Sequence, residues 1–544
     1  MATVVETVLD EERPDPISES AAPDPRGRLA QLLATRPDLV ITALLVVAVV
    51  LVQGLNIENF PTVSDDEGTY LAQAWAIQHG KGLAHYSYWY DHPPLGWVQI
   101  AALSWIPALI WHGPLVVMHA RVIMLPVSAA GTALTYLVGR RINLPRWAAA
   151  LAAVVFGLSP LSVTMQREIY LDNFAAVWML AAFACALSPR RHLWHHIAAG
   201  LCAAVSVLSK ETMLITAPAL VMAVWRGTDK ATRKFSLVGF FIAFSTIGAQ
   251  YLLYAVLKGE LFPGTGHNSL IGALQYQLGR GGSGNILKAG SVSNMTLHWW
   301  LVRDPLLIYA GTAAALAALA VRRLREIGVA AVLLVVVAMR PNGYLPAMYV
   351  IQVIPFFALA IAGMADTGVR GLLRLRFGVL GRLDWLGLGR WRLGPRDLVA
   401  VLAIALAGVV APQWEAGDET ADTAYSNNEY VAAADWIRAN IPDPAHQRIV
   451  VDDAMWLDTV RDGFQPGLGA IWFYKVDLDP AVTRTLPHGW QDLDYVVLTS
   501  IIRQDPNGLP TVRAAIAHST TVATFGTGQQ QITIQKVDHT GSGQ

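Results

Sequence analysis

The sequence has little charge and almost no cysteine. Only 15% of its 544 residues are charged, 54% are hydrophobic, and the formal net charge at pH 7 is zero. So few charges in a chain of this length predict a membrane protein instead of a soluble one. The balanced charge gives no support for a nucleic-acid partner. The two cysteines, Cys185 and Cys202, lie in apolar stretches, so they offer neither a disulfide framework nor a metal-ligand spacing.

Long apolar runs take the place of charged segments. The first, at about 39–55, follows an acidic, proline-rich segment, 1–36, that predicts a disordered tail. Arginines directly before a span hold that end in the cytoplasm, so we expect the tail inside and the next loop outside. At ~20 residues per span, the chain holds about eleven spans. The later runs lie near 118–138, 147–163, 173–188, 196–209, 212–225, 235–256, 304–321, 327–340, 345–364 and 398–413.

The apolar segment 95–111 is ambiguous, because it is broken by Pro107 and contains Gln99 and Ser104. If it crossed the membrane, the later clusters of arginine and lysine would fall outside, against the usual excess of basic residues in cytoplasmic loops. We therefore expect an interfacial or re-entrant helix here. An odd number of spans then places the C-terminus outside the cytoplasm, in a multi-pass protein of the plasma membrane.

Charged and polar residues return in 414–544, where short apolar runs alternate with a helical pattern. The pattern predicts a helix at 429–440, strands at 448–451 and 495–498, and an edge strand at 530–535. Asp452 and Asp453 follow a strand, where acids are typically solvated. The predicted fold is thus mainly α. It has a polytopic membrane domain, 37–413, and a small extracytoplasmic α/β domain that we expect to be a lid or an acceptor-binding module.

The first external loop, 57–117, holds the densest group of acids, histidines and aromatic residues in the chain. Asp65, Asp66 and Glu67 open it, the segment 69–78 has the pattern of an amphipathic surface helix, and the turn Asp91-His92-Pro93-Pro94 follows. A plain connection between two spans needs only a few turn residues. The loop therefore predicts a catalytic site at the membrane surface, with a solvated acidic loop as the alternative.

Other polar residues fall on the same predicted outer surface, at the ends of spans or in external loops. They are Arg167, Glu168, Asp172, Lys210, Glu211, His267, Arg280, His298 and Tyr344. Each of them alone is often an interfacial anchor. Their convergence with the acidic first loop favours a common site.

Three short motifs carry a family resemblance: Asp66-Glu67-Gly68-Thr69-Tyr70, Asp91-His92-Pro93-Pro94-Leu95 and Arg167-Glu168-Ile169-Tyr170-Leu171-Asp172. On these motifs, the chain from about 38 to 365 resembles the GT-C membrane glycosyltransferases. It looks most like the branch of the protein O-mannosyltransferases and the aminoarabinose transferases of lipid A. The resemblance implies a hexosyl- or pentosyltransferase that takes a sugar from a polyprenyl-phosphate carrier at the outer face of the membrane.

The resemblance also implies roles for single residues. Asp66 would be the catalytic acid-base group, and Asp172 would be the second aspartate that such enzymes carry after the third helix. By likeness to the aminoarabinose branch, Asp91 and His267 would hold a divalent metal such as zinc, magnesium or manganese. His92 stands where that branch has a lysine touching the carrier phosphate, so Lys210 and Arg280 become the candidate replacements.

The chemistry asks for these residue types on its own terms. A hydroxyl acceptor needs a carboxylate to take its proton, and Asp66, with Glu67 beside it, is the candidate base. The leaving phosphate needs cations to meet its charge. The candidates for phosphate and substrate binding are His92, Lys210, Arg280, Arg167, Tyr70 and Tyr344. Because no covalent pair is evident, a single displacement with inversion is expected.

The expected partners are membrane lipid, the lipid-linked sugar donor, and an acceptor hydroxyl on a protein, a glycan or a lipid. A transporter or flippase of a lipid-linked or polar substrate is the alternative. Transporters typically show paired halves, and charges near the middle of the membrane. This chain shows no internal repeat and its charges lie at predicted helix ends, which favours the enzyme.

Overall fold

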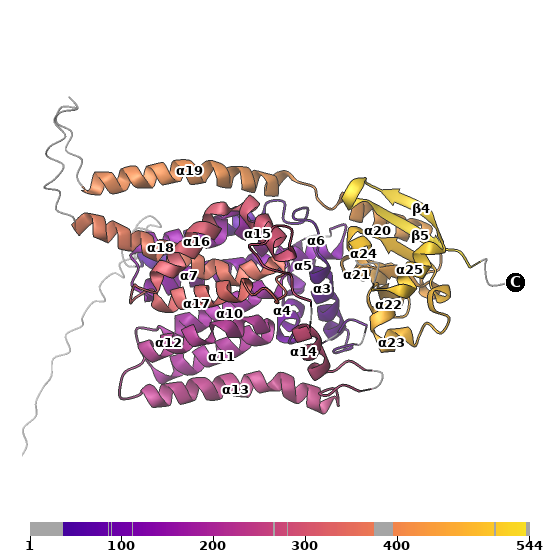
Figure 1. The fold of residues 1–544 in the computed structure, drawn as a ribbon, viewed down its shortest axis with the longest axis horizontal. Helices are drawn as coiled ribbons and strands as arrows, with labels where there is room; N and C mark the ends of the chain where they lie inside the picture. The colour runs from indigo at the N-terminus through magenta and orange to yellow at the C-terminus, as the bar shows by residue number, and fades with distance from the viewer. Residues whose placement is uncertain are drawn as a thin grey trace, which may run out of the picture.

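The computed structural model describes residues 36–84, 86–88, 90–110, 113–264, 267–279, 281–374, 395–504 and 508–539. They form a helical body with a small α/β domain at one end (Figure 1). Nearly all of the predicted N-terminal tail, and Arg280, lie outside the described residues.

The body is built from helices, with η marking a 3-10 helix. In chain order they are α2 (Pro37–Gly54), α3 (Asp65–Gln78), α4 (Leu95–Leu103), α5 (Trp105–Ile110), α6 (Val116–Ala120), η1 (Arg121–Ile123), α7 (Met124–Arg141), α8 (Arg146–Leu158), α9 (Pro160–Arg167), α10 (Leu171–Ala186), α11 (Leu193–Ser209), η2 (Glu211–Thr216), α12 (Ala217–Gly227), α13 (Arg233–Leu257), α14 (Leu270–Gly279), α15 (Val292–Arg303), α16 (Pro305–Ala318), α17 (Arg325–Ala338), η3 (Ala347–Tyr349), α18 (Val350–Arg374) and α19 (Pro395–Thr423).

The predicted apolar runs all coincide with helices or with consecutive helices of this body. Within the described residues, five helical segments are long and apolar enough to cross a membrane, or up to seven if each of two bent pairs is one span. The mainly α, multi-helix fold is thus confirmed, and the number of eleven spans stays a prediction. The ambiguous segment 95–111 forms two short helices, α4 and α5, that divide at Ser104 and not at Pro107.

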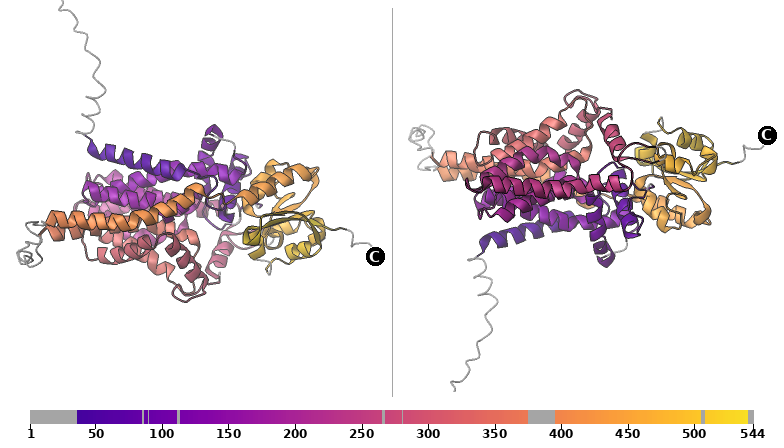
Figure 2. Two further views of the ribbon diagram at one scale, coloured as in Figure 1. Left: turned by 90° about the horizontal axis from the view of Figure 1, so that it is seen from above. Right: turned by 90° about the horizontal axis from the view of Figure 1, so that it is seen from below.

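Helix α10 packs against α7, α11, α12 and α18 and lies within the body. Small residues let the helices approach closely, as is typical of helices packed in a membrane. A Cβ at Gly200 of α11, for example, would overlap the carbonyl oxygen of Phe240 in α13. Helix α18 is largely buried, whereas α19 lies along the outside of the body (Figure 2).

The C-terminal domain is organised around a five-stranded sheet with strand order β2-β1-β3-β5-β4. β1 pairs in parallel with β2 and β3, and β5 pairs antiparallel with β3 and β4. The elements are α20 (Asn428–Asn440), η6 (Pro444–His446), β1 (Ile449–Val451), α21 (Asp453–Arg461), β2 (Ala470–Trp472), α22 (Lys475–Leu478), α23 (Pro480–Thr483), η7 (Gly489–Asp492), β3 (Tyr495–Leu498), α24 (Ser500–Gln504), α25 (Pro510–Ala517), β4 (Ser519–Phe525), η8 (Gly528–Gln530) and β5 (Ile532–Val537).

Most of the predicted elements of this domain are confirmed. The helix at 429–440 is α20, and the strands at 448–451 and 495–498 are β1 and β3. The predicted edge strand at 530–535 is real, but its place at the edge is wrong, because β5 has β3 on one side and β4 on the other. The missed strand β4 is mostly half-exposed or exposed, so it lacks the apolar run that marks a buried strand.

The C-terminal domain contacts the body through α21, which packs on α3 (Figure 1). The segment 69–78 is helical as predicted, but its expected surface position is wrong: α3 lies between α4 and α21, and most of its residues are buried. A Cβ at Gly68 would overlap the carbonyl oxygen of Asp453, so glycine permits this approach. The expectation that Asp452 and Asp453 are solvated is also wrong, since both are buried.

Candidate functional site

The three consecutive acids at the start of α3 face different surroundings. The Ser64 side chain accepts a hydrogen bond from the N–H of Glu67, and the Glu67 side chain accepts one from the N–H of Ser64. This reciprocal cap fixes the start of the helix. Successive helical residues point about 100° apart, so Asp65, Asp66 and Glu67 are directed to different neighbours.

Glu67 is held by a buried arginine. Arg121 donates from Nη2 to Oε2 of Glu67 at 2.6 Å and from Nε to Oε1 at 2.9 Å, and both side chains are 0% exposed. Oε1 also accepts from the N–H of Ile169 at 3.1 Å. With both carboxylate oxygens engaged, Glu67 joins α3, η1 and the segment before α10, which is a positioning arrangement.

Asp65 turns towards the C-terminal domain. Its Oδ1 accepts from the N–H of Asp453 at 3.0 Å, and the Asp453 carboxylate accepts from the hydroxyls of Thr69 and Tyr474. Burial, and then repulsion among neighbouring carboxylates that include Asp452, raises the pKa of Asp65 and of Asp453 well above the usual range. This contact therefore favours a proton on the pair.

Asp66 faces a third group of residues, which come from segments far apart in the sequence. Tyr70, one turn along α3, donates a hydrogen bond to Oδ1 of Asp66 at 3.4 Å. Burial raises the pKa of Asp66, Lys210 and His92 oppose this rise, and Asp91 and Asp172 add to it. A carboxylate whose pKa is raised is a stronger base, and the cations beside it can meet a developing negative charge.

Lys210 stands at the centre of this group, directly after α11. Its Nζ lies 2.8 Å from Nε2 of His92 and 3.6 Å from Oδ2 of Asp172. Two nitrogens at 2.8 Å need one donor and one acceptor, so Nε2 of His92 accepts from the lysine ammonium. Burial would lower the pKa of Lys210, but Asp172, Glu211, Asp66 and Asp91 together raise it.

Glu211 fixes the other side of the His92 ring. Its carboxylate lies 3.1 Å from Nδ1 of His92, which therefore donates. Loss of hydration alone would raise the pKa of Glu211, but attraction to His92 and Lys210 lowers it to about 2. Glu211, His92, Lys210 and Asp172 thus form one chain of polar contacts beside Asp66.

Asp172 is oriented by a glutamine of α18. Gln352 donates from Nε2 to Oδ1 of Asp172 and to Oγ1 of Thr212, each at 2.6 Å. The second oxygen of Asp172 faces Lys210 and has no hydrogen bond among the described residues. Oδ1 of Asp91 is likewise buried without a hydrogen-bond partner in the described part of the chain. Both oxygens can accept from a bound ligand.

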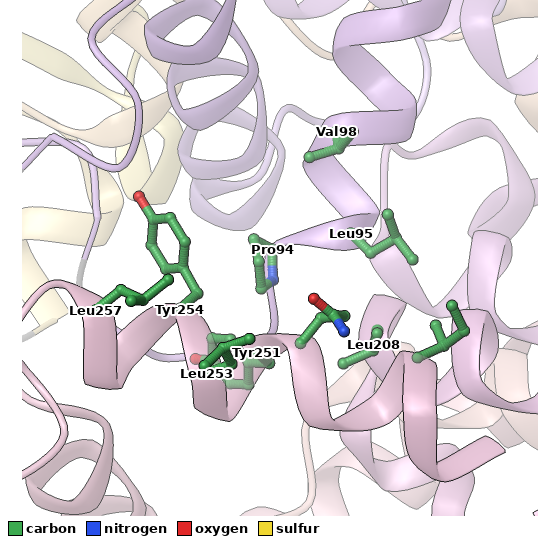
Figure 3. Close-up of a pocket in the computed structure, with 10 residues that line it drawn as sticks. Pro94, Leu95, Val98, Leu208, Tyr251, Leu253, Tyr254 and Leu257 are labelled. Carbon is green, nitrogen blue, oxygen red and sulfur yellow. The ribbon is translucent and has the colours of Figure 1, made fainter. Parts of the chain in front are cut away.

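An apolar pocket of 360 Å³ opens beside these polar residues (Figure 3). Its walls come from the start of α4, the end of α11 and the C-terminal half of α13: they are Pro94, Leu95, Val98, Leu208, Ile247, Gln250, Tyr251, Leu253, Tyr254 and Leu257. Tyr251 connects the pocket with the polar group, because its hydroxyl donates to the carbonyl oxygen of His92 at 3.2 Å. The pocket thus adjoins the backbone of His92, and its wall residues Pro94 and Leu208 each lie two residues along the chain from His92 and Lys210.

The C-terminal domain fixes the loop that carries Asp91 and His92. Lys475, which is 1% exposed, donates from Nζ to the carbonyl oxygen of Tyr88 at 3.2 Å and to Asp479 at 3.1 Å. Burial lowers the pKa of Lys475, although the negative charges of Asp453 and Asp91 act to raise it. Tyr86 in the same loop stacks on Trp456 of α21 at 6.0 Å between ring centroids. The two domains therefore share the surroundings of Asp91.

Two predicted substrate-binding residues lie in other contacts. Arg167 is buried and donates to the carbonyl oxygens of Val52 and Ala421 and to the Asp422 carboxylate, which connects α9 with α2 and α19. Tyr344 is 45% exposed on the segment between α17 and α18, which Ser283 binds through backbone and side-chain hydrogen bonds.

The predicted metal ligands find no support in the geometry. Within the described part of the chain, no group of three or more histidine, cysteine, aspartate or glutamate side chains could hold a metal ion. Nδ1 of His267 lies 2.9 Å from the carbonyl oxygen of Asn268 in its own loop. The residues present do not fit a metal with several protein ligands, and no step of the reaction is derived through one.

Sequence reasoning missed Arg121, Gln352 and Lys475. A signal existed for the first two, because each is a lone polar residue in an apolar run, and such residues are typically paired in a membrane protein. Lys475 lies in a polar domain, where nothing in the sequence distinguishes a buried lysine from a solvated one.

One protein-family model matches part of the chain. The family model described as dolichyl-phosphate-mannose-protein mannosyltransferase matches residues 85–261, a range that includes Asp91, His92, Asp172 and Lys210. Comparison with curated protein sequences gave no significant match.

Solved structures match nearly the whole chain at low identity. ArnT from Cupriavidus metallidurans in the apo state is 15% identical with a TM-score of 0.57, covering 92% of this chain and 98% of that one. The same protein bound to undecaprenyl phosphate is 14% identical with a TM-score of 0.56, and the match covers 91% of this chain and 97% of that one. A third match is the archaeal oligosaccharyltransferase AglB from Archaeoglobus fulgidus in complex with an inhibitory peptide and a dolichol-phosphate. It is 13% identical with a TM-score of 0.52, and the match covers 92% of this chain and 75% of that one.

The chain therefore has the fold of the GT-C membrane glycosyltransferases, as its motifs predicted. Together with the family model, this likeness confirms the resemblance to the mannosyltransferase-like and ArnT-like branch of that class.

Proposed function

We propose that the protein is an integral-membrane glycosyltransferase that moves a sugar from a polyprenyl-phosphate sugar to an acceptor hydroxyl at the outer face of the plasma membrane. The single observation that carries the proposal is the juxtaposition of Asp66 with Lys210 and His92 at the end of an apolar pocket. A donor of this kind consists of an apolar tail, a phosphate and a sugar. The protein presents an apolar pocket, then Lys210 and His92, and then the carboxylate of Asp66, in the same order.

The apolar pocket is assigned to the isoprenoid tail of the donor. It lies between helices at the edge of the body, where a lipid can enter sideways from the bilayer. The phosphate at its polar end would meet Lys210 and His92. Undecaprenyl phosphate and dolichol-phosphate are bound by ArnT and AglB, whose folds this chain shares, which supports the assignment.

Asp66 is assigned as the general base. The acceptor oxygen forms a bond to the anomeric carbon while the bond from that carbon to the phosphate oxygen breaks, and the hydroxyl proton passes to Asp66. Polyprenyl phosphate leaves with the bonding electrons, and the ammonium of Lys210, which His92 helps to orient, stabilises its charge. One displacement without an enzyme nucleophile inverts the anomeric centre.

The other acids receive positioning roles in this proposal. Asp172, held by Gln352, keeps the Lys210 ammonium beside His92. Glu67, paired with Arg121, holds the start of α3 so that Asp66 points into the site. Only Asp66 of the three adjacent acids is close to the cations of this group.

The C-terminal domain is assigned to the acceptor side of the site. Lys475 and Trp456 hold the loop around Tyr88 and Tyr86, and this loop leads directly to Asp91 and His92. The Oδ1 atom of Asp91 is buried without a hydrogen-bond partner among the described residues, so it can accept a hydrogen bond from a hydroxyl of the sugar. The match of the mannosyltransferase family model favours a hexose, mannose, as the first donor to test, before a pentose.

The test is to incubate the purified full-length protein in lipid nanodiscs with polyprenyl-phosphate mannose, radiolabelled in the sugar, and with the corresponding arabinose donor. We expect label to pass to an acceptor hydroxyl with release of polyprenyl phosphate. Protein reconstituted into vesicles provides the second readout. Movement of intact donor between leaflets without release of polyprenyl phosphate would instead establish the alternative, a flippase.

A further inference from the structure

We propose that a second pocket, at the end of the body opposite to Asp66, binds the phosphate head group of an anionic membrane phospholipid. The pocket encloses 340 Å³ and is formed by the last turns of α12 and the turn that opens α17. This volume lies within the range of ordinary small-molecule sites. It has no part in the reaction proposed above, and it shares no lining residue with the apolar pocket near Lys210.

Its location follows from the direction of η2 and α12. Glu211 begins η2 beside the Asp66 site, and Arg226 lies in the last turn of α12, at the second pocket. With six residues of 3-10 helix at ~2 Å per residue and eleven of α-helix at ~1.5 Å, the two ends lie up to about 28 Å apart. That is about the thickness of a bilayer's hydrocarbon core. The second pocket thus lies at the other membrane surface.

The pocket carries a net positive charge. Arg226 forms an ion pair with Glu326 at 2.7 Å, so these two charges compensate each other. Arg322 and Arg325 also line the pocket, and no acidic side chain among the described residues forms an ion pair with either of them. Arg325 donates from Nε to the carbonyl oxygen of Leu319 at 3.0 Å, which leaves its terminal nitrogens for a ligand. Two uncompensated guanidinium groups are suited to bind a phosphate.

The pocket also has the polarity gradient of a phospholipid. Val221 and Met222 form an apolar wall one turn before Trp225, and Arg226 follows. Trp225 is exposed, and the guanidinium of Arg233 lies over its ring at 4.4 Å. Tryptophan typically lies at the level of lipid head groups, with arginines beyond it. Acyl chain, glycerol and phosphate would therefore meet apolar, aromatic and basic residues in turn.

This combination selects an anionic lipid over a neutral zwitterionic one. Basic pockets between helices at the cytoplasmic surface are typical sites for anionic head groups, and each arginine near an anionic surface contributes about fivefold in affinity. A choline head group would place its own cation against Arg322 and Arg325, whereas a glycerol head group would not.

The test is native mass spectrometry of the full-length protein in detergent, titrated with phosphatidylglycerol or with phosphatidylcholine of the same acyl chains. We expect tighter binding of phosphatidylglycerol, a loss of about fivefold in its affinity for Arg322→Gln, and about 25-fold for the double variant with Arg325→Gln. The side chain of Arg322 has no hydrogen-bond or ion-pair partner among the described residues, so Arg322→Gln removes no internal contact. Arg191→Gln is the control, because Arg191 pairs with Asp229 outside the pocket.

Equal affinity for the two lipids, or unchanged phosphatidylglycerol binding in Arg322→Gln, would overturn the proposal. A third arm tests the source of the phosphate. Displacement of the lipid by inorganic phosphate, but not by sodium chloride of equal ionic strength, would assign the pocket to a free anion and overturn the lipid assignment.

Discussion

Two groups of carboxylates lie on the two faces of α3, and they differ in their partners. On the face towards the body, Asp66 lies near Lys210 and His92. The neighbouring carboxylates Asp91 and Asp172 each have one oxygen without a hydrogen bond among the described residues. On the face towards the C-terminal domain, Asp65 and Asp453 are hydrogen-bonded by a backbone N–H and by the hydroxyls of Thr69 and Tyr474.

The difference separates chemistry from docking. Cations stabilise carboxylates in their charged form, which is the form that accepts a proton, and they can also meet a phosphate. Burial and repulsion between neighbouring carboxylates, which the hydrogen bonds from the hydroxyls and the backbone only partly offset, favour the protonated form, which can sit in a packed interface at low cost. We therefore expect changes on the body side to alter turnover, and changes on the domain side to alter stability and its pH dependence.

The largest stability effect should come from Glu67→Gln, which tests the claim that Glu67 is a positioning residue. The change leaves Arg121 buried with an uncompensated charge, and removing one partner of such a pair typically costs about 3–5 kcal/mol. We expect a strongly lowered melting temperature in detergent. The control is Asp435→Asn, whose exposed pair with Arg438 contributes at most about 1 kcal/mol. A Glu67→Gln protein of normal stability but without turnover would move Glu67 into the chemistry.

Lys210→Gln should act on turnover more than on folding. Loss of a cation that meets the leaving phosphate is expected to reduce the transfer rate by ~10²–10³, about 2.7–4 kcal/mol of barrier. Single-turnover transfer from the labelled donor measures it. Lys258→Gln is the matched control, since Lys258 pairs with Glu260 at the surface. Retention of more than a third of the wild-type rate in Lys210→Gln would contradict its assignment.

Gly68→Ala sharpens the comparison on the docking side. The added Cβ would overlap the carbonyl oxygen of Asp453, so α21 has to move away from α3, at a cost of about 1–3 kcal/mol. We expect faster proteolysis at the junction between α19 and α20 with the helical body intact. Gly248→Ala in α13, where a Cβ meets no atom within 4 Å, is the control. Equal proteolysis of both variants would show that the domain is not held here.

The smallest effect, and the one with a distinct pH signature, is expected for Asp453→Asn. The pKa of Asp65 and Asp453 is raised in the folded protein, so their contribution to stability is present at low pH and is lost as pH rises through the raised values. Asparagine removes this loss, and the variant should melt at a higher temperature than wild type at alkaline pH. If the melting temperatures of wild type and Asp453→Asn change with pH in parallel, Asp65 and Asp453 do not form a protonated pair.

How far the sequence led can be judged on α3 itself. Asp66, Asp172 and Lys210 were singled out from the sequence, and the structure brings these three residues together. The burial of α3 was not visible. It depends on α21, nearly 400 residues away, and a long-range contact that needs a glycine at one position leaves no periodic pattern.

The same reason explains the other differences. Asp452 and Asp453 have the sequence pattern of solvated acids at a strand end. Contact with α3 buries Asp453, whereas Asp452 is buried inside the C-terminal domain, where Tyr430 donates a hydrogen bond to it. The interior position of β5 was missed because its partner β4 is largely exposed and lacks the apolar run that marks a buried strand. The pairing of Glu67 with Arg121 instead had a local sign, the lone arginine in an apolar run, which the rules for membrane helices can use.

The most direct test of the account compares the three neighbouring acids in one experiment. Single-turnover transfer and melting temperature are measured side by side for Asp65→Asn, Asp66→Asn and Glu67→Gln, each nearly isosteric. We predict that Asp66→Asn alone keeps the wild-type melting temperature and donor-lipid binding while losing ~10²–10⁴ in rate. If Asp66→Asn keeps a tenth or more of the wild-type rate while Asp65→Asn abolishes transfer at unchanged stability, the chemistry lies on the other face of α3 and the account is wrong.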